Sequence, residues 1–167
     1  NMAGMTGTHT NLELSSFSIN GVGQAAMVIT HVTVSSIDNI SIEGFQGENG
    51  FVFEYMWGNS IGLLKTNGAL ISHSAFKFNA GVLDTVFEHL YSSNFSDYSF
   101  DFNNTRIEYS VPQAGGDGVN TVLLMTAQGA NVAAININGL SRYKIINMYS
   151  ENNQEMLHVS GNVSDVS

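Results

Sequence analysis

Acidic side chains are the residues best able to do chemistry in this sequence of 167 residues. The chain has 14 Asp and Glu residues against 5 Lys and Arg, and it has no cysteine. Hydrolysis of a glycosidic bond needs two carboxyl groups about 5–9.5 Å apart, one to donate a proton and one to act as base or nucleophile. Binding a sugar without cleavage needs exposed aromatic rings beside a few polar groups.

A hydrolytic pair cannot come from one strand, because no two acidic residues are spaced i, i+2. Asp97 and Asp101 would share a face of a regular strand, but about 13 Å apart, since each residue advances a strand by about 3.3 Å. A pair must therefore be assembled from neighbouring segments. The catalytic candidates lie among aromatic residues in the less regular middle of the chain: Glu54, Asp84, Glu88 and Asp101. A solvated surface carboxylate is the alternative interpretation of each.

Segment 51–59, with the sequence FVFEYMWGN, is the best candidate for binding a sugar. Tyr55 and Trp57 offer aromatic faces, and Asn59 offers an amide. The only tryptophan of the chain also interrupts the strand pattern here. A buried aromatic cluster that fills part of the core is the competing interpretation.

Metal and nucleic-acid chemistry are disfavoured by the composition. The 5 histidines are isolated, without HxH or HxxxH spacing, so a zinc site is not expected. A formal net charge of -9 with few basic side chains would repel phosphate backbones. The apolar runs are shorter than the roughly 20 residues that span a bilayer. We therefore expect no metal, no cofactor, no nucleic-acid partner and no membrane insertion.

Short strands must position these residues. Apolar residues alternate with small polar ones in segments such as 28–34, 94–103 and 132–140, and each such segment predicts a strand with one buried face. Turn signals such as Asn20-Gly21 separate the strands. No segment predicts a helix longer than one or two turns, so the fold class is expected to be all-β.

A repeat of about 25 residues indicates how the strands stack. Segment 40–50 aligns with segment 143–153, which makes Ile40 equivalent to Tyr143 in the repeat. The apolar anchors then fall at Phe17, Phe45, Phe76, Phe100, Leu123 and Met148. One coil cannot bury its apolar face alone, so coils stacked about 4.8 Å apart must close the core. Asn side chains at equivalent turns would bond between coils, and the candidates are Asn39, Asn79, Asn103 and Asn152.

We therefore expect residues 1–167 to form one segment of a right-handed parallel β-helix, a single chain wound in coils of about 25 residues. The first residue is not Met, and the last residues alternate like a strand that stops, so we expect a fragment of a longer chain. A β-sandwich or jelly roll is the alternative, because it would show the same alternation.

Two stretches of sequence carry a family resemblance. NISIEGFQGENG (39–50) and GLSRYKIINMYSENNQEMLHVSGNVSDVS (139–167) resemble coils of the pectate-lyase-like superfamily, in particular the β-helix of bacteriophage tailspike and tail-fibre proteins. A coil of that family reads as an apolar alternation, an aromatic residue or Gly, and then Glu or Gly before Asn-Asn. The resemblance covers 11–50 and 131–167 and is a pattern of residue types.

The resemblance implies a homotrimer on a virion tail, or otherwise outside the cell. It also implies a receptor-binding protein that recognises host-cell surface polysaccharide and, in many members, depolymerises it. A glycoside hydrolase fits better than a lyase, because neutralising a uronate requires basic groups or calcium that the chain does not cluster. The alternative is a structural β-solenoid without a ligand, such as a virion shaft or an adhesin.

Overall fold

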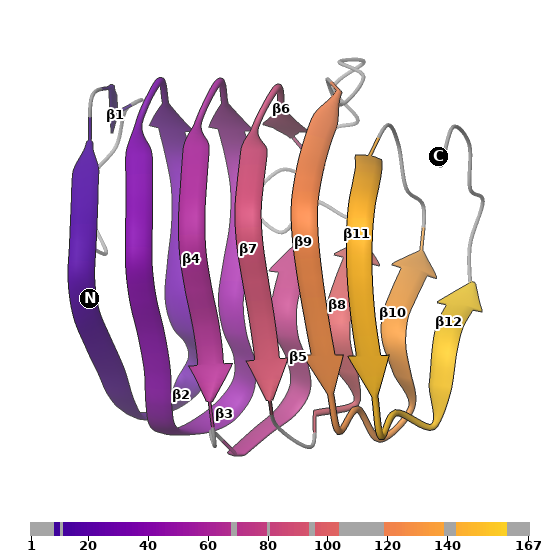
Figure 1. The fold of residues 1–167 in the computed structure, drawn as a ribbon. Coiled ribbons are helices and arrows are strands. Elements are labelled where there is room, and N and C mark those ends of the chain that lie inside the picture. The colour runs from indigo at the N-terminus through magenta and orange to yellow at the C-terminus, as the bar shows by residue number, and fades with distance from the viewer. Residues whose placement is uncertain are drawn as a thin grey trace.

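Parallel strands wind into a solenoid in the computed structural model. It describes residues 9–10, 12–67, 70–79, 81–93, 96–103, 119–138 and 143–159. These residues form about 5 turns with coils of roughly 24 residues (Figure 1). Strands at the front of Figure 1 run down and those behind run up as the chain advances from left to right, which is a right-handed path. The expected β-helix is confirmed, and the β-sandwich alternative is wrong.

Twelve strands make up the described part of the chain, and all of them pair in parallel. They are β1 (His9–Thr10), β2 (Glu13–Thr33), β3 (Ser36–Trp57), β4 (Ser60–Asn67), β5 (Leu70–Phe78), β6 (Val82–Leu83), β7 (Val86–Ser93), β8 (Tyr98–Asn103), β9 (Asn120–Gln128), β10 (Ala133–Asn138), β11 (Tyr143–Glu151) and β12 (Glu155–Val159). No helix among the described residues is long and apolar enough to cross a membrane.

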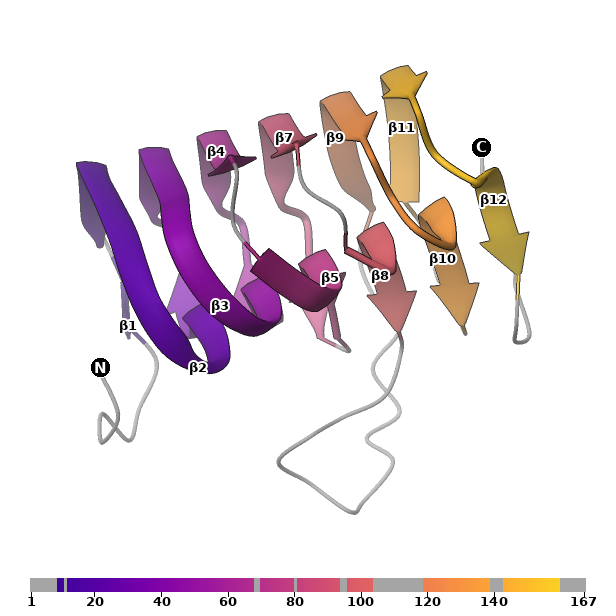
Figure 2. The same cartoon turned by 90° about the horizontal axis from the view of Figure 1, so that it is seen from below.

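Each early coil has three sides, which we number along the chain. The first side contains β4, β7, β9 and β11, and the second contains β5, β8, β10 and β12; Figure 2 shows them as two rows. Strands β2 and β3 are long because each bends through the first side, the second side and the start of the third. The short third side pairs β1, the ends of β2 and β3, and β6.

Residues with left-handed backbone make the bends of the third side. The bend before it uses His31 (φ 56), Tyr55 (φ 49) and Gly81 (φ 86), and the bend after it uses Val34 (φ 47), Gly58 (φ 63) and Asp84 (φ 47). Residues other than Gly rarely adopt this conformation, and β-branched residues such as Val34 adopt it least often. The same dihedral angles recur in successive coils, so the stacked ladders hold the bends in place.

Two columns of phenylalanine rings fill the core. One contains Phe51, Phe76 and Phe100, and the other contains Phe53, Phe78 and Phe102. Neighbouring rings in a column stack with centroids 4.5 to 5.3 Å apart. All six rings are at most 2% exposed. Stacked coils therefore bury like residues above one another, as the repeat predicted.

The inferred repeat has the right length but the wrong register. Pairing runs from Ile40 through β4, β7 and β9 to Met148, so Ile40 is equivalent to Met148 and not to Tyr143. The predicted anchor Leu123 is 38% exposed, although Phe76 and Phe100 do stack. Unequal coils caused the misalignment: equivalent corner residues are 24 positions apart in one coil and 35 in another.

Asparagine side chains join the coils, mainly at corners other than the predicted ones. Asn59 Oδ1 accepts a bond from Ser35 N at 3.1 Å, and its Nδ2 donates to Val32 O at 3.1 Å. Asn120 bonds Thr85 N and Val82 O in the same way, and Asn153 bonds Ala130 N and Ala127 O. Among the predicted positions, Asn39 contacts Ser16 Oγ at 3.5 Å, and the amide of buried Asn79 makes no hydrogen bond.

Candidate functional site

The predicted sugar-binding segment divides into buried and exposed residues. Glu54 and Asn59 are each 3% exposed, and the Asn59 amide is engaged in the corner described above. The partly exposed Tyr55 ring lies 5.2 Å from that of His31. Trp57 is 55% exposed, so its indole does not belong to the core formed by the phenylalanine columns.

Two of the predicted residues meet at the corner after the third side. Trp57 Nε1 donates a hydrogen bond to Asp84 Oδ2 at 3.2 Å. Because Trp57 pairs with Leu83, Asp84 belongs to the next coil, and the bond fixes the exposed indole across two coils. Glu88 lies elsewhere, exposed on β7 of the first side. Of the four acidic candidates, Asp84 thus contacts an exposed aromatic ring.

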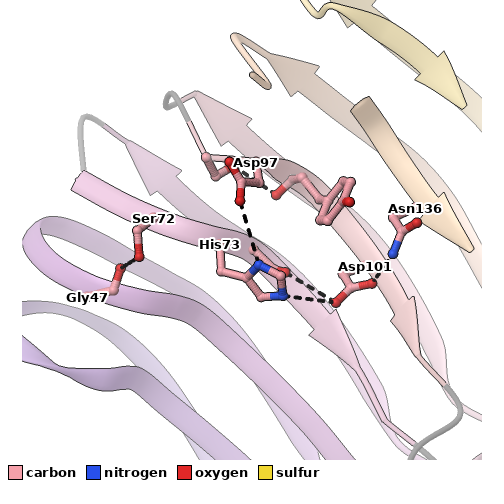
Figure 3. Close-up of polar contacts among 9 residues, drawn as sticks. Gly47, Ser72, His73, Asp97, Asp101 and Asn136 are labelled. Carbon is pink, nitrogen blue, oxygen red and sulfur yellow. Dashed lines mark hydrogen bonds and ion pairs between the residues drawn. The ribbon is translucent and has the colours of Figure 1, made fainter. Parts of the chain in front are cut away.

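A larger polar cluster lies on the outer face of the second side, where the sequence singled out only Asp101. It contains His73, Asp97, Asp101 and Asn136, which Figure 3 labels, together with Tyr98, and we call it the histidine–aspartate cluster. His73 Nδ1 lies 3.8 Å from Asp97 Oδ2, and His73 Nε2 lies 3.8 Å from Asp101 Oδ2. One imidazole therefore stands between two carboxylates.

A β-bulge in β5 sets the position of His73. Gly47 of β3 pairs with Ile71, but Asn49 pairs with Ser74, so β5 contains one extra residue at Ser72–His73. Ser72 Oγ donates to Gly47 O at 3.3 Å across this irregularity. A bulge changes the direction of its side chains. The regular pattern of alternating faces could therefore not have predicted where His73 lies.

Asp101 forms the buried base of the cluster. It lies between Phe100 and Phe102 in β8, so its side chain is on the face opposite the core. Its Oδ1 accepts a bond from Asn136 Nδ2 at 2.7 Å, its Oδ2 accepts one from Ser74 Oγ at 3.3 Å, and it is 2% exposed. Such a carboxylate holds its neighbours in place but is poorly reached by a ligand.

The carboxylates of Asp97 and Asp101 lie closer together than the roughly 13 Å expected from regular strand positions, because each is 3.8 Å from a nitrogen of the His73 ring. Asp97 lies in a bend directly before β8, which begins at Tyr98, so its side chain is not held to the alternation of the strand. Both carboxylates approach the same imidazole, and the Asp97 side chain is 44% exposed whereas that of Asp101 is 3% exposed. Asp97 is thus the member of the pair that solvent and ligands can reach.

Aromatic rings extend the cluster along the solenoid. The partly exposed Tyr98 ring lies 5.8 Å from that of His73 and 6.4 Å from that of His158. Burial, and then the charges of Asp101, Asp97 and Glu155, raise the pKa of Tyr98, so its hydroxyl remains a neutral hydrogen-bond donor. A ring flanked by imidazoles and rimmed by carboxylates can stack on a sugar and bond its hydroxyls.

The sequence reveals this cluster only when the pairing register of the strands is known. Asp101 pairs with Asn136, and Asn136 pairs with His158, so these residues form one outward row. Unequal coil lengths hid this row, and His73 appeared as an isolated histidine. Within the described residues, no group of three or more His, Asp and Glu side chains is arranged to hold a metal ion.

Comparisons with protein-family models, curated proteins and solved structures find no match.

A histidine on the first side predicts a pH dependence of stability. Burial, and then the charge of Lys65, lower the pKa of His89 from its usual 6.5. Below pH 6.5 the unfolded chain therefore binds a proton that the folded chain does not bind until the lowered pKa is reached. The stability contributed by neutral His89 is fully present above pH 6.5 and is lost as the pH falls through the lowered pKa of His89.

We expect His89→Gln to lose less stability than the unsubstituted chain on acidification across that window. Glutamine can keep the contact that His89 Nε2 makes with Thr126 Oγ1 at 3.2 Å, but it does not titrate. Melting temperatures of both proteins on either side of pH 6.5 measure the difference. Equal losses in the two proteins would contradict the assignment to His89.

Proposed function

We propose that this chain is the receptor-binding β-helix of a phage tailspike or tail-fibre protein and that it recognises a host-cell surface polysaccharide. The observation that carries the proposal is the group of accessible rings of His73, Tyr98 and His158 beside the carboxylates of Asp97 and Glu155. A homotrimer on a virion tail, outside the cell, is part of the same proposal and rests on the coil resemblance.

Preorganisation of the histidine–aspartate cluster supports binding. Asp101 is held by Ser74 and Asn136 and in turn flanks His73, so the side chains that face a ligand sit on a rigid base. Binding then costs less side-chain entropy than it would on a loop. The surrounding carboxylates and the net charge of -9 favour a polymer with few negative charges.

Depolymerisation is a second candidate function, and the position of His73 between two carboxylates favours it. Asp97 is the group placed to exchange a proton with a substrate, and Asp101 would act as a positioning residue because it is buried. Shortening of a bound polysaccharide, followed by size-exclusion chromatography, would identify this activity. A shaft without a ligand, the structural alternative, would show neither binding nor shortening.

We expect Tyr98→Ala to weaken polysaccharide binding about tenfold or more, because the ring offers the stacking surface between the two imidazoles. The probe is an array of purified bacterial capsular polysaccharides and lipopolysaccharide O-antigens, applied to the full-length protein. Val22→Ala is the control, because Val22 is 84% exposed on β2, two coils before the β5 strand that carries His73. Binding that Tyr98→Ala leaves unchanged, or no binding to any polymer, would overturn the proposal in favour of a structural role.

A further inference from the structure

The outer face of the first side carries a second aromatic network, separate from the histidine–aspartate cluster. Pairing places Tyr91, Thr126 and Tyr149 in one row on successive strands β7, β9 and β11, which lie side by side in Figure 1. Gln128 and Glu151 lie in the next row. Tyr91 and Tyr149 are therefore two coils apart, about 10 Å, since neighbouring strands are spaced by about 4.8 Å.

Hydrogen bonds fix both tyrosines. Tyr91 Oη donates to Gln128 Oε1 at 3.0 Å, and Gln128 Nε2 donates to Glu151 Oε2 at 3.2 Å. Tyr149 Oη donates to the same Glu151 oxygen at 2.9 Å. That bond raises the pKa of Tyr149, so its hydroxyl remains a proton donor. We call Tyr91, Gln128, Tyr149 and Glu151 the tyrosine ladder.

The ladder leaves aromatic surface open to solvent. Tyr149 is 51% exposed although its hydroxyl is bonded, so the exposed part is mainly the ring. Thr126, the small residue between the tyrosines, is 8% exposed and contacts His89 Nε2. The His89 ring meets the Tyr91 ring edge-on at 6.2 Å and supports it. Two supported rings thus stand at a fixed spacing along the solenoid axis.

We infer that the tyrosine ladder is a glycan-binding site, and that it takes an extended chain of uncharged sugars lying parallel to the solenoid axis. A pyranose presents an apolar C–H face that can stack on a tyrosine ring, and one sugar of an extended chain is about as long as one coil spacing. Alternate sugars would therefore lie over Tyr91 and Tyr149, with Gln128 and Glu151 facing the sugar hydroxyls. The Glu151 carboxylate disfavours polyanions.

This site does not depend on the histidine–aspartate cluster, because it lies on another side of every coil. Cellohexaose, chitohexaose and mannohexaose are the probes, and binding to the full-length protein is measured by calorimetry. We expect at least one hexasaccharide to bind more tightly than its disaccharide, because a disaccharide spans one tyrosine only. Tyr149→Ala should weaken that binding about tenfold. Tyr149→Phe should weaken it less, because it keeps the ring and loses only the bond to Glu151.

Controls separate this inference from the proposed function. Val22→Ala, an exposed substitution on β2 outside both sites, should leave hexasaccharide binding unchanged, whereas Tyr98→Ala should impair capture on the polysaccharide array. Failure of all three hexasaccharides to bind, or equal binding by Tyr149→Ala, would overturn the tyrosine ladder as a glycan site while leaving the other cluster untouched. A Tyr149→Ala protein that loses self-association but not saccharide binding would also overturn it, by assigning the face to contacts between copies.

Discussion

Replacing Phe78 with alanine is expected to lower the free energy of unfolding by about 3–5 kcal/mol. The Phe78 ring is 2% exposed and stacks between Phe53 and Phe102 in its column. Its ring also packs edge-to-face with the rings of Phe87 and Tyr143, at centroid distances of 5.4 and 5.7 Å. It therefore joins the core of the second side to that of the first side. Parallel ladders on each flank prevent the coils from collapsing into the vacated space.

Denaturant unfolding followed by circular dichroism measures this effect. Leu70→Ala is the matched control, because Leu70 lies in the same strand and is 68% exposed, so its loss should change stability by less than about 0.5 kcal/mol. Domains of this size are stable by about 5–15 kcal/mol, and the Phe78 substitution therefore removes a large share. A midpoint for Phe78→Ala equal to that of Leu70→Ala would contradict the role assigned to the column.

Replacing Asn120 with alanine is expected to have the second largest effect. Asn120 is fully buried and bonds Thr85 N at 3.1 Å and Val82 O at 2.8 Å. Alanine would leave both backbone groups buried without this partner, at a cost of about 1–3 kcal/mol for each. Asn59 makes the equivalent two bonds at the same corner two coils earlier, so Asn59→Ala should cost a similar amount.

Asn147→Ala provides the control for the corner amides. Asn147 Nδ2 also donates to the preceding coil, to Leu123 O at 3.3 Å, but in an exposed setting where water can replace the bond. Its substitution should change the unfolding midpoint little. If all three alanine variants unfold at the same denaturant concentration, the corner amides do not stabilise the fold in the way that we propose.

Side-chain alternation predicted the fold class because each strand has one buried face, but it could not predict the register. Bends at Val34 and Tyr55 use left-handed backbone in residues that carry no sequence signal for it. The alternation therefore restarts at each corner with a new phase. Asn59 was interpreted as a ligand-binding amide for the same reason, since its bonds to Ser35 and Val32 exist only once the coils are stacked.

The candidate site was predicted only in part. Trp57 and Asp84 were both singled out, but their hydrogen bond depends on the pairing of β3 with β6. The aromatic neighbours of Asp101 indicate a site, whereas His73 has no second histidine at a metal-binding spacing. The bulge that aims His73 towards Asp101 is a property of the β3–β5 ladder, which no local pattern in β5 reveals.

The long coil shows where the solenoid can change its length. Val86 pairs with Thr121 and Phe100 pairs with Ile135, each 35 positions ahead, so both long sides resume in register after Asn103. Closing a connection twice as long costs only about 0.6 kcal/mol of chain entropy. Peptides inserted between β8 and β9 should therefore leave the pairing of the ladders on either side unchanged. The connection between β8 and β9 is therefore the position at which we expect the solenoid to tolerate an insertion without a change in its core.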